Sequence, residues 1–138
     1  MARHPFRQAV AERHREYDEA ATNMLRFSEE LLSVVGFDRA ELEAAEKLGI
    51  TFEAGDYLLK VRNCYVKGRW QHVFIAAPRS VGCDVGWSNI EHNPFPDGWI
   101  CHALGTGTAV YPEPHIAAEV VRSVKALAEK VAARPLSG

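Results

Sequence analysis

Apolar residues recur every three or four positions through the first quarter of the chain. This spacing places them on one face of a helix, which predicts a long amphipathic helix packed against a core. Gly36 follows the last apolar position, and glycine readily adopts the left-handed conformation that ends a helix. We therefore predict a first helix within residues 1–35, with a buried face formed by Phe6, Val10, Tyr17, Ala21, Met24, Leu31 and Val35.

A second, short helix is predicted directly after the first. Asp38 and Glu41 have the spacing of a capping box, in which each side chain accepts a hydrogen bond from the backbone of the other residue. Gly49 then ends the helical pattern. We predict a helix over residues 38–48, which either covers the sheet or adds to a surface that binds a partner.

β-branched and aromatic residues concentrate in the next part of the chain. They fill the segments 57–66 and 70–76, with Lys67-Gly68-Arg69 between them, a pattern that predicts a β-hairpin. A weaker apolar run over residues 81–87, interrupted by two glycines, adds a third strand. The interpretation is an antiparallel β-meander over residues 57–87.

Prolines and glycines crowd residues 89–113, so we expect a long loop without extended regular elements there. Its apolar side chains favour an ordered loop, and Trp99 is expected to pack against the last helix. Pro114 suits the first turn of that helix, predicted over residues 114–134. The expected fold is therefore α+β: two helices, a meander, a long loop and a final helix with a buried stripe of Ile116, Val120, Val124, Leu127 and Val131.

The composition narrows the classes of function. A chain of 138 residues with 47% hydrophobic content fits one domain with its own core. The net charge of −2 gives no reason to expect nucleic acid or anionic lipid as a partner. The first residues lack the pattern of a signal peptide, and no apolar run approaches the roughly 20 residues of a membrane span. We expect a cytoplasmic protein that contacts no membrane.

Three cysteines, Cys64, Cys83 and Cys101, stand far apart and include no C-x-x-C pair. An odd number without that spacing argues against a disulfide framework and against a thiolate zinc site. We expect reduced thiols, no cofactor and no metal. Cys64 and Cys83 are interpreted as small buried apolar residues.

Cys101 stands in a more specific pattern. Asn93 lies eight residues before it, Gly98 three before it and Ile100 directly before it. This spacing resembles the active site of the ubiquitin-conjugating enzymes. The segment from Tyr111 to Pro114 and the apolar helix after it also resemble that family, so the specific likeness covers about residues 74–131.

The resemblance implies a conjugating (UBC-like) fold and a transferase activity. Cys101 would accept a ubiquitin-like modifier as a thioester from an adenylating enzyme and pass it to an amine on a target protein. The amide of Asn93 would stabilise the oxyanion, a role worth on the order of 3 kcal/mol in other acyl-transfer enzymes. The expected partners are therefore the ubiquitin-like modifier, the adenylating enzyme and the target protein.

His92 directly precedes Asn93, whereas the family has a proline between the two residues. We expect His92 to hold the loop by hydrogen bonds. This altered order resembles the divergent bacterial branch, which implies an antiphage-type conjugation pathway. The acidic residue that usually follows the family's cysteine is missing, and His102 and Glu113 are its candidate substitutes. Because adjacent residues on an extended segment point to opposite sides, direct pairing of His102 with Cys101 is not expected.

Other interpretations stay open. The protein could be a catalytically inactive UBC-fold adaptor that binds a ubiquitin-like partner. The loop could also form a metal or redox site, although its spacing does not match structural zinc patterns. Asn93 could cap a turn rather than serve an oxyanion. The basic residues of the first helix could contact the adenylating enzyme or form a solvated face. The residues of the metal alternative are Cys101, His102, His92 and His115, and the basic residues are Arg3, Arg7, Arg13 and Arg15.

Overall fold

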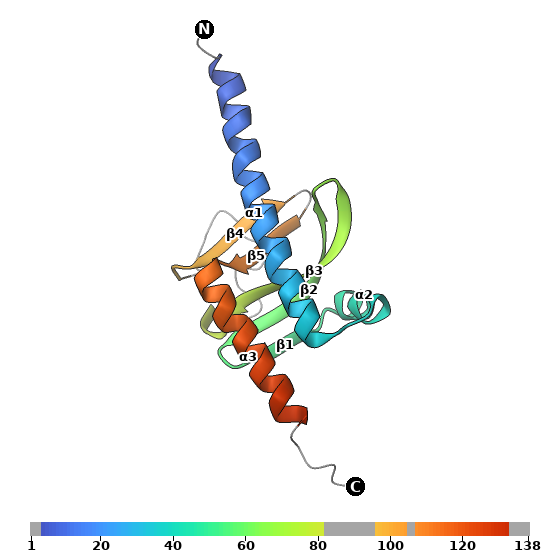
Figure 1. Cartoon of the computed structure of the whole chain (residues 1–138). Helices are drawn as coiled ribbons and strands as arrows, with labels where there is room; N and C mark the ends of the chain where they lie inside the picture. Colours follow the sequence, from blue (N-terminus) through green and yellow to red (C-terminus); the bar gives the residue numbers. More distant parts are fainter. Residues whose placement is uncertain (1–3, 82–95, 105–106, 133–138) are drawn as a thin grey trace.

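A computed structural model describes residues 4–81, 96–104 and 107–132 (Figure 1). These residues form an α+β fold of three helices, a three-stranded sheet and a two-stranded sheet. Among the helices of these segments, none offers an apolar stretch long enough to cross a membrane.

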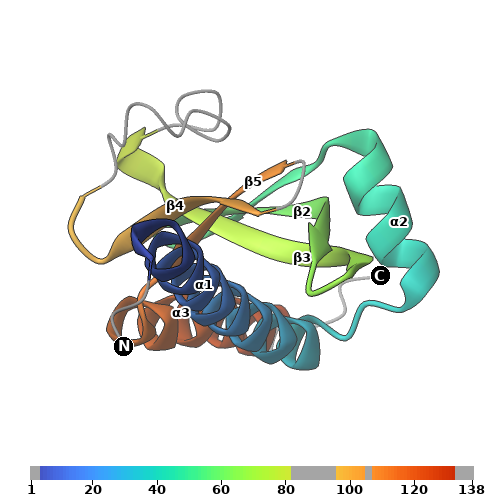
Figure 2. The ribbon, with the colours of Figure 1, turned by 90° about the horizontal axis from the view of Figure 1, so that it is seen from above.

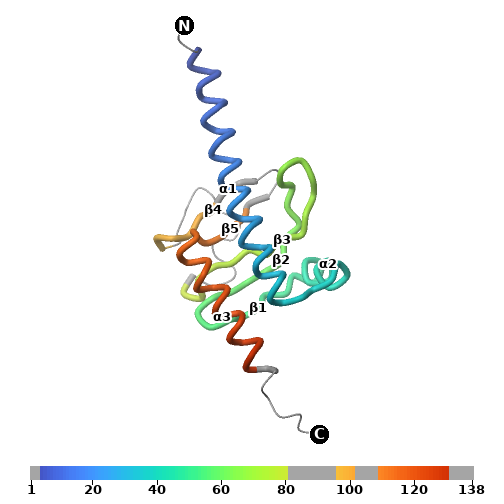
Figure 3. The backbone as a smooth tube through the Cα atoms, in the orientation of Figure 1, coloured from blue at the N-terminus to red at the C-terminus, as the bar shows by residue number. Residues whose placement is uncertain are grey.

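Helix α1 (Pro5–Val35) has two different halves. From Ala20 to Leu31 one face is buried in the core. The first turns of α1 extend beyond the strands, as Figure 3 shows, and Phe6 and Val10 are 77% and 69% exposed. The prediction that these two residues belong to the buried face was therefore wrong. The helical period was right, but the described part of the chain packs nothing against the first turns.

The first sheet is an antiparallel meander of β1 (Thr51–Ala54), β2 (Tyr57–Val66) and β3 (Arg69–Pro78). The two-residue turn between β2 and β3 confirms the predicted hairpin. Lys67 and Gly68 both have positive φ, as a type I′ turn requires. Strand β1 was not predicted, because four residues are too few to show a period.

The predicted third strand over residues 81–87 falls largely outside the described residues. Val81, where it was expected to begin, belongs instead to the short 3₁₀ turn Arg79–Val81. The sheet gains its third strand from β1, on the other side of β2.

A second antiparallel sheet pairs β4 (Trp99–Leu104) with β5 (Gly107–Pro112). This hairpin corrects the expectation that residues 89–113 form a loop without extended regular elements. The described glycines and prolines of residues 89–113 lie outside the two strands or at their ends, so they do not interrupt the hydrogen bonds between β4 and β5. Three consecutive residues of β5 join the core, since Ala109, Val110 and Tyr111 are all fully buried.

Helices α1 and α3 (Pro114–Ala132) lie side by side against the strands, and α2 (Arg39–Leu48) lies at the edge of the molecule (Figure 2). The predicted capping box of α2 is present, since Glu41 N donates to Asp38 Oδ1 at 2.8 Å and Asp38 N donates to Glu41 Oε1 at 3.2 Å.

Helix α3 begins at Pro114, as predicted. Val120 and Val124 of its expected apolar stripe are buried, whereas Leu127 is 44% exposed. The prediction for Leu127 was wrong because an open cavity, rather than packed side chains, lies beside it.

Candidate active site

Cys101 lies in the middle of β4, opposite Val110 of β5. Its side chain is partly buried and packs against the hydrophobic core. This burial raises the pKa of the thiol above its ordinary value, because a thiolate loses solvation there. The thiol is therefore mainly protonated at neutral pH.

Cys64 differs from Cys101 in exposure. Its side chain on β2 is only 2% exposed, and burial raises the pKa of its thiol as well. The interpretation of Cys64 as a small core residue is confirmed. Of the two cysteines in the described segments, Cys101 is the more accessible to a reagent or a partner.

A tight turn at Gly98 sets the beginning of β4. Gly98 has φ 95°, a backbone conformation that residues with a side chain rarely adopt. Its carbonyl accepts a hydrogen bond from Glu113 N at 2.7 Å. A Cβ on residue 98 would lie 2.7 Å from Cγ1 of Ile116 on α3. The turn thus brings the backbone three residues before Cys101 against the start of α3, and only glycine fits there without a shift.

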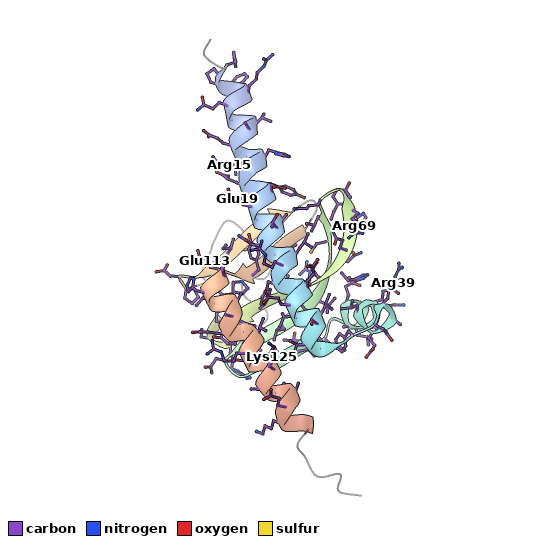
Figure 4. The ribbon with its side chains drawn as sticks, viewed as in Figure 1. Arg15, Glu19, Arg39, Arg69, Glu113 and Lys125 are labelled. Atoms are coloured by element: carbon purple, nitrogen blue, oxygen red, sulfur yellow. The ribbon has the colours of Figure 1, made fainter. Side chains whose placement is uncertain are left out.

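Two polar side chains lie at this end of α3. His115 Nδ1 is 3.6 Å from Glu113 Oε2, and His115 Nε2 lies beside the Gly98 turn. Figure 4 shows Glu113 where the hairpin meets α3. Glu113, expected as one substitute for the family's acid, therefore lies next to the turn that precedes the cysteine strand.

Aromatic packing fixes the same end of β4 from the other side. The Trp99 ring, on a residue 8% exposed, lies 5.9 Å from the ring of Tyr57. The Tyr57 hydroxyl donates to Glu119 Oε2 of α3 at 3.1 Å, and burial, with Glu119 as a second cause, raises the pKa of Tyr57. Sequence reasoning missed Tyr57 and Glu119, since no local pattern links β2 to α3.

The described residues do not include all of the predicted site. Asn93 and His92 lie outside them, as does Cys83, so the expected roles of Asn93 and His92 stay predictions. Residue 102 continues β4, but its side chain lies outside the description. As far as the described residues go, no three His, Cys, Asp or Glu side chains gather in a way that could hold a metal ion.

No family model, curated protein or solved structure matches the chain.

Proposed function

We propose that the protein is a ubiquitin-like conjugating enzyme of a bacterial, antiphage-type pathway, with Cys101 as the thioester-forming residue. The observation that supports it is the position of Cys101. Its thiol is partly exposed and lies on β4. The turn at Gly98, which precedes this strand, is hydrogen-bonded to Glu113 and packs against the start of α3. The resemblance in sequence uses these same two residues at this same spacing.

The first chemical step is a thioester exchange. Sγ of Cys101 attacks the carbonyl carbon of the modifier's C-terminal thioester on the adenylating enzyme, so a new C–S bond forms and the old one breaks. The proton of the Cys101 thiol passes to the leaving thiolate. Because the acyl group arrives already activated, the raised pKa of Cys101 is compatible with this step.

The second step transfers the modifier to an amine of the target protein. The amine nitrogen attacks the thioester carbonyl, an amide bond forms, and Cys101 leaves as a thiolate that takes up the amine's proton. The oxyanion that forms on the way requires a donor, and Asn93 carries this role in the proposal. The thiolate that leaves is reprotonated readily, since burial favours the neutral thiol.

The alternative is a UBC-fold adaptor that binds a ubiquitin-like partner without forming a thioester. Partial burial of Cys101 and the raised pKa of its thiol favour this second function, because both reduce the amount of reactive thiolate.

Intact-mass measurement separates the two functions. The protein is mixed with the adenylating enzyme and the modifier from its own operon and with ATP. Wild type is compared with Cys101→Ala, and Cys64→Ala serves as the matched control because its thiol is buried. We expect an adduct of the modifier's mass, removed by reductant, in wild type and Cys64→Ala and absent in Cys101→Ala.

A charged adenylating enzyme that leaves no adduct on the wild type would overturn the catalytic proposal. Retained binding of the modifier to the protein in that case, measured by calorimetry, would establish the adaptor. An adduct that forms normally in Asn93→Ala but discharges more slowly to lysine would assign Asn93 to the second step.

A further inference from the structure

Phe6 and Val10 form an exposed apolar surface near the beginning of α1, which we call the knob. All side chains from His4 to Glu16 are exposed, and this segment of α1 carries Phe6 and Val10 one helical turn apart. Both continue the helical face that is buried further along α1. The first turns of α1 extend beyond the strands (Figure 3), and the two large apolar side chains that they carry are exposed to solvent.

An apolar cavity of about 610 Å³ opens elsewhere on the molecule, between the last turn of α1, the sheet and α3. Three phenylalanine rings form its inner wall with centroids 5.9–6.5 Å apart, and Leu127 lines it while staying 44% exposed. Cavities of about 300–1,000 Å³ hold drug-sized ligands, so this one has room for two apolar side chains. Its lining residues are Val34, Val35, Phe37, Phe52, Glu53, Ala54, Leu59, Phe74, Val124, Leu127 and Ala128.

The knob and the cavity of one molecule cannot meet. Phe6 lies near the beginning of α1, and Val35, which lines the cavity, is the last residue of the helix. With a rise of about 1.5 Å per residue, the two residues are about 44 Å apart along the helix axis. Only another molecule can bring the knob to the cavity.

Charge makes the two surfaces complementary. Residues 4–16 around the knob contain three arginines and two glutamates, a net charge of +1, and Arg13 lies 3.9 Å from Glu16. Residues 29–56, which supply six of the cavity's lining residues, contain eight acidic and two basic residues. Glu53, the charged residue of the lining, is 3.3 Å from Arg79, which offsets part of its negative charge. Opposite charges at the two ends favour contact between the knob of one copy and the cavity of the next. The acidic residues are Glu29, Glu30, Asp38, Glu41, Glu43, Glu46, Glu53 and Asp56.

We propose that the protein associates head to tail, with Phe6 and Val10 of one copy seated in the apolar cavity of a second copy. The contact joins two different surfaces, so each copy keeps one unused knob or cavity and the assembly can grow or close into a ring. A single helix segment buries less than the roughly 1,200 Å² of a standard interface. The association is therefore weak, with a Kd on the order of 10–100 μM.

Sedimentation velocity over a concentration series tests the contact. We expect the wild-type mean mass to rise above that of the monomer as the concentration passes the Kd. Phe6→Glu removes the knob and Leu127→Glu charges the cavity, and each variant alone should stay monomeric. Both positions are exposed, so circular dichroism should show unchanged folding. Trp70→Ala is the matched control, because Trp70 is 56% exposed but lies in neither surface, and it should associate like the wild type.

Mixing the two defective variants gives the decisive result. Phe6→Glu keeps an intact cavity and Leu127→Glu keeps an intact knob, so an equimolar mixture should form a one-to-one dimer and nothing larger. A wild type that stays monomeric at every concentration would overturn the proposal. So would association that survives both substitutions, or a mixture that remains monomeric. A small apolar molecule retained by a monomeric wild type in native mass spectrometry would assign the cavity to a different occupant.

Discussion

A single buried hydroxyl connects α1 to the outer edge of β3. Phe74 N donates to Ser28 Oγ at 2.9 Å, and Ser28 is 2% exposed. Replacing Ser28 with alanine leaves this backbone N–H buried without its acceptor, which costs about 1–3 kcal/mol. We expect Ser28→Ala to lower the free energy of unfolding by that amount in urea denaturation. Ser33→Ala, at an exposed position of the same helix, should change it by much less.

The thiol of Cys101 should react slowly near neutral pH. Burial raises the pKa of Cys101 in the folded state, so less thiolate is present than in the unfolded chain at the same pH. Iodoacetamide should therefore modify native Cys101 more slowly at pH 8 than it does in urea, and the native rate should rise as the pH passes above the ordinary thiol value of about 8.5. Peptide mapping by mass spectrometry gives the rate for each cysteine.

The same shift in pKa has a consequence for stability. Below about pH 8.5 the thiol is protonated in both states, and its contribution to folding is complete. At higher pH the unfolded thiol ionises first, so the free energy of unfolding falls as the pH approaches the raised folded pKa. Cys101→Ser should show a shallower fall above pH 8.5, and an equally steep fall in Cys101→Ser would contradict this assignment.

The start of β4 depends on a glycine that touches α3. Gly98→Ala adds a Cβ at 2.7 Å from Ile116 and also places a side chain at φ 95°. Gly49→Ala also places a side chain at a positive φ, 64°, but the added Cβ would meet no atom within 4 Å. We expect Gly49→Ala to cost about 1 kcal/mol and Gly98→Ala clearly more, as measured by thermal denaturation. Equal losses would mean that Ile116 moves aside freely.

The beginning of α2 depends on its capping box. Asp38→Ala removes the acceptor of the Glu41 N–H and should lower the free energy of unfolding by about 1 kcal/mol, within a range of about 0.5–2 kcal/mol. Asp38→Asn keeps a side-chain oxygen at the same place and should be nearly neutral. Chemical denaturation of the three proteins side by side checks the difference.

At the scale of the whole molecule, charge is unevenly distributed between the protruding segment of α1 and residues 29–56. If head-to-tail contact brings these regions together, screening should weaken it. We expect the apparent Kd to rise severalfold between about 0.05 M and 0.5 M salt, because the Debye length shortens from about 14 Å to about 4 Å. A Kd that falls with salt would indicate a contact driven by apolar burial alone.

Local signals in the chain predicted the parts of the fold that depend on neighbours in sequence. The cap of α1 at Gly36, the capping box of α2, the Lys67-Gly68 turn and the start of α3 at Pro114 all require only a few consecutive residues. For the candidate site, the spacing of Gly98 and Cys101 was readable in the same way. The physical reason for a glycine at position 98 could not be read from the sequence, because Ile116 meets Gly98 only once the hairpin packs on α3.

Tertiary structure decided which apolar residues are buried and which strands pair. Phe6, Val10 and Leu127 follow the helical period of buried residues but remain exposed, since burial needs a partner surface that the period does not encode. The β4–β5 hairpin forms in a segment rich in glycine and proline because its ladder runs between those residues and β5 gains a place in the core. Sequence by itself determined the turns, the caps and the position of the cysteine. Long-range packing determined the cavity and the environment of the thiol, because each is made by residues far apart in the chain, and it left Phe6 and Val10 without a partner surface.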